Sequence, residues 1–158
     1  MENSGSCIVM ALFMDDVCYL SNVGDCRAIS SQSKGAKRIT ITSDHKPGNA
    51  RENDRIVKAG GKVYRSNMPR CLQDLERSGN KLNSNHETID KCFGPERVYP
   101  GKLSVSRAIG DLYAKDPDLG GNPRVVIPNP DTYKLTITKD NDFLVLGSKP
   151  FPSPIKNH

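Results

Sequence analysis

The chain has 158 residues, of which 35% are hydrophobic, and its 23 basic and 18 acidic residues give a net charge of +5. This length and composition are typical of one globular domain with its own core and exclude a fully disordered chain. The positive charge is dilute and is not interleaved with aromatic residues, so we expect no nucleic-acid partner.

An apolar run, Cys7–Met14, is the most hydrophobic stretch near the N-terminus. No basic segment precedes it, and Asp15-Asp16 follows it in place of a small-residue cleavage site, so it predicts a strand and not a signal peptide. No run approaches the roughly 18 apolar residues that cross a bilayer, so we expect no membrane partner. The cysteines are odd in number and form no Cys-x-x-Cys pair, which predicts reduced thiols in a cytoplasmic or nuclear protein: Cys7, Cys18, Cys26, Cys71 and Cys92.

The first strands should form a hairpin of Cys7–Phe13 and Val17–Val23, joined at Asp15-Asp16. Because Cys7–Phe13 is apolar throughout, we expect it to be covered on both faces. Arg38–Thr42 alternates between polar and apolar residues, as a half-buried strand does.

The stretch Tyr19–Ala28 links two strands through Gly24 and Asp25. One interpretation is a tight hairpin in which the glycine supplies a positive φ, while Asp25 and Arg27 are solvated. The other makes Asp25 an oxygen ligand for Mg²⁺ or Mn²⁺. On these residues alone the hairpin interpretation is favoured.

A helix is predicted over Asn49–Ala59, ended by Gly60-Gly61. Asn49 and Glu52 have the spacing of an N-cap and its capping-box partner. His45, just before the helix, has no second His or Cys at ligand spacing, which favours a turn-stabilising role over metal binding or general base catalysis.

The pattern loosens after a short predicted strand at Lys62–Tyr64. We expect an irregular insertion at about residues 66–96, with a short helix through Cys71, Leu72 and Leu75 and its most mobile part at Asn80–Glu87.

The next dense segment is Arg97–Tyr113, in which Ser106, Arg107 and Asp111 are interpreted as turn and capping residues bonded to one another. No histidine stands with Ser106 in a nucleophile arrangement, so we do not assign it as a nucleophile.

Three more strands are predicted toward the C-terminus, the last two as a hairpin turning at Asp140-Asn141: Arg124–Ile127, Tyr133–Thr138 and Asp142–Leu146. Residues 149–158 contain three prolines, and we expect them to be disordered.

Five short motifs stand in one order with regular intervals, and together they are specific: Asn22-Val-Gly-Asp-Cys-Arg-Ala28, Asp44-His-Lys-Pro47, Arg55-Ile-x-x-Ala-Gly-Gly-x-Val63, Ser104-Val-Ser-Arg-Ala-Ile-Gly-Asp111 and Asp142-Phe-Leu-Val-Leu146. The series resembles the metal-dependent serine/threonine protein phosphatases of type 2C. The resemblance covers residues 5–148, and two stretches look most like plant or protist members: Pro100–Arg107 and Gly120–Val126.

This resemblance implies an α+β fold, a sandwich of two antiparallel sheets flanked by helices, with a dinuclear Mg²⁺ or Mn²⁺ site at one edge. The implied partners are phosphorylated proteins, whose phosphoserine or phosphothreonine is hydrolysed by a metal-activated water. Asp25 matches an aspartate that helps to hold an accessory third ion. The other matched motif positions are interpreted as structural: Gly24, Arg27, Ser106, Arg107, Gly110 and Asp111.

The departures from the family pattern leave the catalytic residues unknown. The early metal-binding segments and the phosphate-binding arginine have no match, the late Asp-Asn is also missing, and Lys149 stands where an aspartate is expected after Ser148. We therefore expect the middle part of a phosphatase domain, as a truncated gene product or an incomplete gene model, with weak metal binding or none. The alternative is a catalytically dead domain that binds a phosphoprotein or a regulatory partner.

A partial sandwich is also expected to leave sheet edges open. Such edges associate with other chains, so we predict a marginally stable protein that self-associates.

Overall fold

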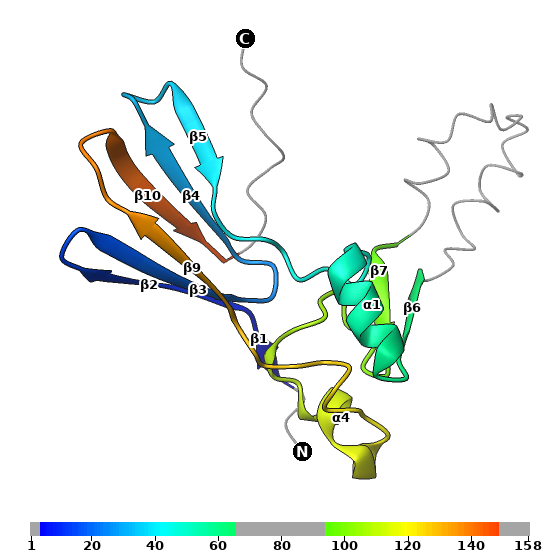
Figure 1. Ribbon diagram of the computed structural model, residues 1–158. Coiled ribbons are helices and arrows are strands. Elements are labelled where there is room, and N and C mark those ends of the chain that lie inside the picture. Colours follow the sequence, from blue (N-terminus) through cyan, green and yellow to red (C-terminus); the bar gives the residue numbers. More distant parts are fainter. Residues whose placement is uncertain (1–3, 66–93, 149–158) are drawn as a thin grey trace, which may run out of the picture.

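The computed structural model describes residues 4–65 and 94–148 (Figure 1). Strands dominate these ranges, with one regular helix and two short helical turns. The strands are β1 (Gly5–Ser6), β2 (Ile8–Met14), β3 (Val17–Val23), β4 (Arg27–Gln32), β5 (Lys37–Thr40), β6 (Lys62–Arg65), β7 (Glu96–Tyr99), β8 (Ile109–Gly110), β9 (Asp131–Thr136) and β10 (Asn141–Gly147). The helices are α1 (Ala50–Lys58), α4 (Leu112–Lys115) and a 3₁₀ turn (Pro117–Leu119).

Two antiparallel three-stranded sheets pack face to face. One has the strand order β2-β3-β9 and the other β10-β4-β5. Their shared core is centred on Cys18 and Leu20 of β3 and Ala28 of β4, all nearly inaccessible to solvent. Side chains from both sheets surround these three: Val9, Ala11, Tyr133, Leu135, Ile137, Ile41 and Leu144. The predicted α+β fold with an antiparallel sandwich is confirmed.

Two of the predicted hairpins are wrong. β3 and β4 are consecutive in sequence but lie in different sheets, and so do β9 and β10. β9 pairs with β3, aligning Leu135 with Cys18, whereas β10 pairs with β4, aligning Val145 with Ile29. Each turn therefore carries the chain from one layer to the other. The β2–β3 hairpin is confirmed, and β4 pairs with β5 as the next hairpin.

β2 is not covered on both faces, contrary to the prediction. Val9 and Ala11 pack on the core, but Met10, Leu12 and Met14 are more than half exposed. The apolar run forms an edge strand whose outward face has no layer above it among the described residues.

A second small core lies beside α1. It consists of Ile56, Val98, Ala114, Val125 and Val126, each fully buried. Arg124–Ile127 was predicted to be a strand, but it is a turn whose bridge to the rest of the fold is a single parallel pair, Arg107 with Ile127. The burial of Val125 and Val126 explains the apolar pattern without a strand.

The remaining strands join distant segments. β6 pairs with β7, so the two strands that flank residues 66–95 in the sequence lie side by side. The predicted helix at Cys71–Leu75, the mobile stretch Asn80–Glu87 and the tail at residues 149–158 lie outside the described residues. The domain boundaries and the insertion therefore stay predictions.

Within the described ranges no helix is long and apolar enough to cross a membrane. Cys7, Cys18 and Cys26 are free thiols, as predicted for them.

Candidate functional site

The turn between β3 and β4 is fixed by two hydrogen bonds to His45. The Gly24 N–H donates to His45 Nδ1 over 3.0 Å, and the His45 N–H donates to the Gly24 carbonyl over 2.9 Å. Gly24 has φ +93°, and an added Cβ would lie 2.1 Å from Cys7 Sγ, so the close approach of β1–β2 requires a glycine there. The turn-stabilising role predicted for His45 is confirmed.

The His45 ring is buried and neutral. Because Nδ1 accepts from Gly24, the ring proton is on Nε2, which faces Asp131 Oδ2 at 3.3 Å. Burial and the nearby Arg107 guanidinium lower the pKa of His45, outweighing the opposite effect of Asp131. This ring is therefore a structural link between the turn and β9.

Asp25 points at a lysine from the segment before α1. Its Oδ2 is paired with Lys46 Nζ, and its Oδ1 accepts a hydrogen bond from Cys7 Sγ at 3.4 Å. Burial alone would raise the pKa of Asp25, but the Lys46 ammonium outweighs burial and lowers it. Burial raises the pKa of Cys7 to about 11, so Cys7 is a neutral thiol that donates to a charged carboxylate.

Arg27 is not merely solvated, as the hairpin interpretation had it, because it is paired with Asp44. Its Nε and Nη2 reach the two carboxylate oxygens at 2.9 Å each, a bidentate pair. The pair joins the start of β4 to the segment that leads to α1.

A buried ionic cluster lies at the first turn of α1, which contains Glu52. Arg107 donates from Nε to Glu52 Oε2 over 3.1 Å and from Nη1 to Asp131 Oδ1 over 2.9 Å. Ser106 Oγ donates to Glu52 Oε2 over 2.6 Å, and Arg55 Nη2 donates to the same oxygen over 2.9 Å. Ser106, Arg107 and Glu52 are all less than 5% exposed.

Glu52 therefore has a different role from the predicted capping box. The Asn49 side chain does not cap α1 and donates instead to the Asp44 carbonyl, while Glu52 turns inward to Arg107. Burial raises the pKa of Glu52, but hydrogen bonds from Arg107, Ser106 and Arg55 outweigh burial and hold it at about 2.

Asp111 and Gly110 lie at the junction with β1. β8 pairs with β1, aligning Gly110 with Gly5, and the Asp111 N–H donates to the Ser4 carbonyl over 2.9 Å. Asp111 has a left-handed φ of 51° and is mostly buried, and burial raises the pKa of its carboxyl group. It is not bonded to Ser106 or Arg107, as the sequence interpretation suggested.

Three other aspartates, Asp15, Asp16 and Asp142, have structural positions at turns. Asp15 and Asp16 form the tip of the β2–β3 hairpin. Asp142 holds the β4–β5 turn, where its carboxylate accepts hydrogen bonds from the backbone N–H groups of Lys34 and Gly35.

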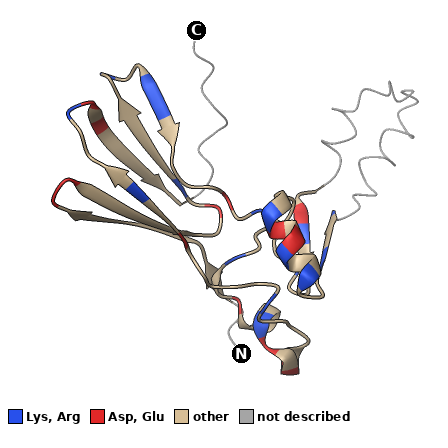
Figure 2. Cartoon of the chain, viewed as in Figure 1, with Lys and Arg blue, Asp and Glu red and all other residues tan. Residues whose placement is uncertain are grey.

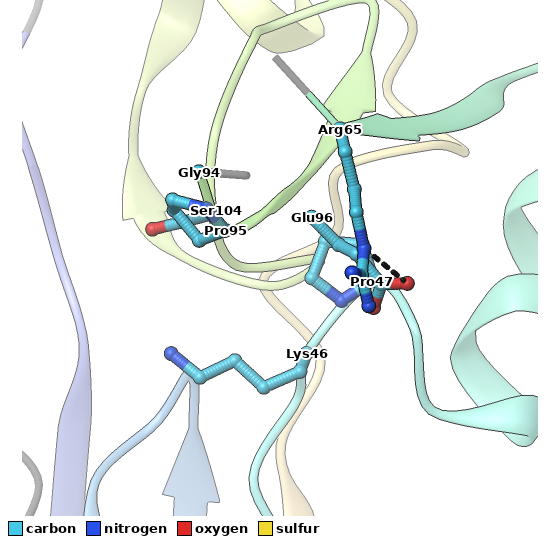
Figure 3. A pocket seen from close by; sticks show the side chains of 7 residues that line it. All are labelled: Lys46, Pro47, Arg65, Gly94, Pro95, Glu96 and Ser104. Atoms are coloured by element: carbon cyan, nitrogen blue, oxygen red, sulfur yellow. Dashed lines mark ion pairs between the residues drawn. The ribbon is translucent and has the colours of Figure 1, made fainter. Parts of the chain in front are cut away.

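A pocket of about 400 Å³ opens beside Lys46. Figure 3 shows Arg65 reaching toward Glu96, its partner at 3.6 Å, while Lys46 extends away from that pair. The pocket is lined by Lys46, Pro47, Arg65, Gly94, Pro95, Glu96 and Ser104.

Comparison with known families decides the assignment. The sequence profile described as protein phosphatase 2C matches residues 1–151. The chain belongs to the protein phosphatase 2C family.

Plant and protist relatives are among the matches. Probable protein phosphatase 2C 30 of Arabidopsis thaliana is 35% identical over 147 residues, which is 93% of this chain and 28% of the relative. Probable protein phosphatase 2C 14 of the same plant is 34% identical over 92% of this chain and 24% of its own length. Probable protein phosphatase 2C 4 of Paramecium tetraurelia is 30% identical, over 87% of this chain and 35% of its own. The chain thus spans about a quarter to a third of these relatives.

Solved structures show the same fold. A C. elegans sex-determining protein superposes with a TM-score of 0.62 at 21% identity, covering 91% of this chain and 27% of its own. A serine-threonine phosphatase 2C from Toxoplasma gondii gives a TM-score of 0.57 at 20% identity, covering 90% of this chain and 40% of its own.

The family is metal-dependent, so the described residues of this protein phosphatase 2C chain must be tested as metal ligands. Over residues 4–65 and 94–148 no three His, Cys, Asp or Glu side chains converge on a possible ion site. Asp25, which matches an accessory-ion aspartate in the family motif, is already paired with the Lys46 ammonium. The described residues alone therefore do not fit a two-metal centre.

Lys46 and Asp131 were not singled out from the sequence, and Glu52 was singled out only as a capping residue, although all three hold the key contacts of this region. Lys46 lies inside the recognised motif Asp44-His-Lys-Pro47. The sequence therefore marks this lysine but does not show that it pairs with Asp25.

Proposed function

We propose that this chain is part of a metal-dependent protein serine/threonine phosphatase that hydrolyses phosphoserine and phosphothreonine in intracellular proteins. Membership of the family over residues 1–151 carries the proposal. The ions are Mg²⁺ or Mn²⁺, and carboxylates beyond the described residues hold them in this proposal, because a two-metal site needs several charged oxygen ligands.

The described residues are then the scaffold of the catalytic domain. The cluster of Glu52, Arg107 and Asp131 ties α1 to the segment before β8 and to the start of β9, and the contacts of His45 tie the Gly24 turn to the same cluster. We propose structural roles for Gly24, Arg27, Ser106, Arg107, Gly110 and Asp111, since their contacts are made within the fold. Asp25 is the one proposed metal position, for an accessory ion that would have to displace Lys46.

The chain by itself is proposed to be inactive. The test is hydrolysis of a phosphothreonine peptide in millimolar Mn²⁺, compared with metal alone and with the Asp25→Ala variant. We expect release of phosphate no faster than with metal alone. Turnover above that level, lost in Asp25→Ala, would show that the chain assembles a working site.

A catalytically dead phosphoprotein-binding domain is the second candidate, and the Lys46–Asp25 pair favours it. A lysine ammonium stands where a divalent ion would have to contact Asp25. Binding of the phosphothreonine peptide, but not of its unphosphorylated form, without turnover would support this candidate. Absence of binding would contradict this second candidate and leave the first proposal, in which the described residues form the scaffold of a catalytic domain.

A further inference from the structure

Two short segments bind each other where the chain passes from the sandwich to α1. One is residues 24–27, at the turn from β3 to β4, and the other is residues 44–46, on the connection from β5 to α1 (Figure 1). Three pairs of residues make the contacts: Gly24 with His45, Asp25 with Lys46, and Arg27 with Asp44. The side chains of Lys46 and Arg27 are 39% and 33% exposed, whereas His45 is 2% exposed. The contact of His45 with Gly24 is therefore the buried one of the three.

His45 binds both peptide groups that flank Gly24. The N–H of the first peptide group donates to His45 Nδ1 over 3.0 Å. The carbonyl of the second, which leads into Asp25, accepts from the His45 N–H over 2.9 Å. Because each peptide group is planar, fixing the two planes sets the φ and ψ of Gly24 and the direction in which the chain enters Asp25.

The backbone before Lys46 is fixed by the same residue. The His45 carbonyl accepts hydrogen bonds from the Ser106 N–H over 2.9 Å and from Ser106 Oγ over 3.1 Å. Its N–H is bound to Gly24, so both polar groups of the His45 backbone have partners. His45 thus sets the starting point of each side chain in the Asp25–Lys46 pair.

The ring can serve Gly24 in one tautomer only. Nδ1 accepts a hydrogen bond when the ring proton is on Nε2, and Nε2 faces Asp131 Oδ2 at 3.3 Å. Asp131 in turn accepts from Arg107 Nη1 over 2.9 Å. Arg107 also pairs with Glu52 of α1, a helix along which Figure 2 shows both acidic and basic residues. The ionic cluster therefore favours the tautomer that accepts from Gly24.

We propose that His45 is the positioning residue of the Asp25–Lys46 pair and acts through the hydrogen bond that Nδ1 accepts from the Gly24 N–H. Loss of this acceptor leaves a buried N–H without a partner, which is costly, so the Gly24 peptide groups reorient and Asp25 moves away from Lys46. Because Asp25 is the position proposed above for an accessory ion, this role rests on the proposed function and extends it to His45.

Two amide variants separate the roles of the two ring nitrogens. In His45→Asn the side-chain oxygen is as many bonds from Cβ as Nδ1 is, so it replaces the acceptor for Gly24. In His45→Gln the side-chain nitrogen is as many bonds from Cβ as Nε2 is, so it keeps a donor toward Asp131 but provides no acceptor at the Nδ1 position. Both variants replace the ring by a neutral amide, so each is the control for the other.

Nuclear Overhauser contacts in the 158-residue chain at pH 7 report the pair directly. The contact between the Lys46 ε-methylene and the Asp25 β-methylene is measured relative to that between the Arg27 δ-methylene and the Asp44 β-methylene. We expect wild type and His45→Asn to keep the first contact and His45→Gln to lose most of it, with circular dichroism matched.

Two results of this measurement would overturn the proposal. Equal contacts in all three proteins would mean that the pair does not need the ring. Equal loss in both variants would mean that the volume of the ring, and not its Nδ1 acceptor, positions the pair.

A second measurement leaves the buried ring unchanged. Coupling between two sites is reciprocal, so removing the pair must weaken the bond of Gly24 to His45. Relative to the Leu20 amide in the core of β3, the Gly24 amide should exchange with solvent about fivefold faster in Lys46→Met, the low end of typical couplings. Lys34→Met loses the same charge at the β4–β5 turn and should leave the rate unchanged.

An unchanged Gly24 rate in Lys46→Met, or an equal rise in Lys34→Met, would also overturn the positioning role. Both measurements are made without metal and without substrate. Their outcome therefore concerns His45 alone, whereas failure of the proposed function would appear only in the metal and phosphatase assays.

Discussion

Glu52 on α1 and Arg107, 55 residues later, form a buried ion pair in which the guanidinium contacts both carboxylate oxygens. Both charged groups have further hydrogen-bond partners: Ser106 and Arg55 donate to Glu52, and Arg107 donates to Asp131. Two buried charges are tolerated together because each satisfies the other, and removing one leaves the other without a partner.

Removing one partner should therefore destabilise the chain strongly. We expect Arg107→Met to lower the free energy of unfolding by about 3–5 kcal/mol, the range for an orphaned buried charge. Urea unfolding of Glu52→Gln, Arg107→Met and the double variant measures the coupling. The double variant should lose less than the sum of the two single losses. Additive losses would mean that the pair contributes no mutual stabilisation.

Acid should remove the contribution of Glu52. Its pKa in the folded state, about 2, lies below the ordinary value of 4.5. Its stabilisation is therefore fully present above pH 4.5 and is lost as the pH falls from 4.5 toward 2, since the unfolded chain binds the proton more readily. We expect the free energy of unfolding to fall across this window, with a shallower fall in Glu52→Gln. Equal slopes in the two proteins would contradict the role of Glu52.

Gly5 should be required by the close approach of Asp111. A Cβ at position 5 would lie 2.0 Å from Asp111 Oδ2, and no positive φ contributes to this requirement. Gly5→Ala should cost about 1–3 kcal/mol, the typical cost of overpacking. In the Asp111→Gly background, which keeps the left-handed conformation at position 111, most of that cost should vanish in thermal unfolding. An unchanged cost in that background would place the clash elsewhere.

The sequence predicted the elements of this fold better than their partners. Strand-forming residues located β3 and β10, and alternation located β9, each within a residue or two, and turn residues marked their ends. Pairing was wrong for β3 with β4 and for β9 with β10, because a short polar turn looks the same whether it closes a hairpin or carries the chain to a second sheet. Local pattern contains no information on which layer receives the next strand.

Two further errors have the same physical origin in long-range packing. Asn49-x-x-Glu52 fits a capping box, yet Arg107 and Ser106 draw Glu52 into the interior, where a charge-assisted pair outweighs one helix-end hydrogen bond. Val125 and Val126 resemble a strand but are buried by α1 and β7 without a strand ladder. The turn at Gly24 and Asp25 was located correctly from the sequence, although it joins two sheets and not a hairpin, and Lys46 was not predicted as the partner of Asp25.

Metal binding at Asp25 is predicted to be limited by Lys46. The ammonium contacts Asp25 Oδ2. Burial raises the pKa of this carboxyl group, but the ammonium outweighs burial and lowers it. A divalent ion must displace this ammonium or share the carboxylate with it, and like charges at contact distance repel. Replacing the lysine by an uncharged side chain of similar length removes that competition while leaving Asp25 in place.

Calorimetric titration with Mn²⁺ should show no resolved binding to wild type below millimolar concentration. Lys46→Met should bind Mn²⁺ several-fold more tightly than wild type, and Lys46→Met/Asp25→Asn should lose the gain, because affinity rises with the number of charged oxygen ligands. Lys34→Met is the matched control, since Lys34 lies at the β4–β5 turn away from Asp25 and loses the same charge. Tight binding by wild type, or an equal gain in Lys34→Met, would show that Lys46 does not compete with the ion at this carboxylate.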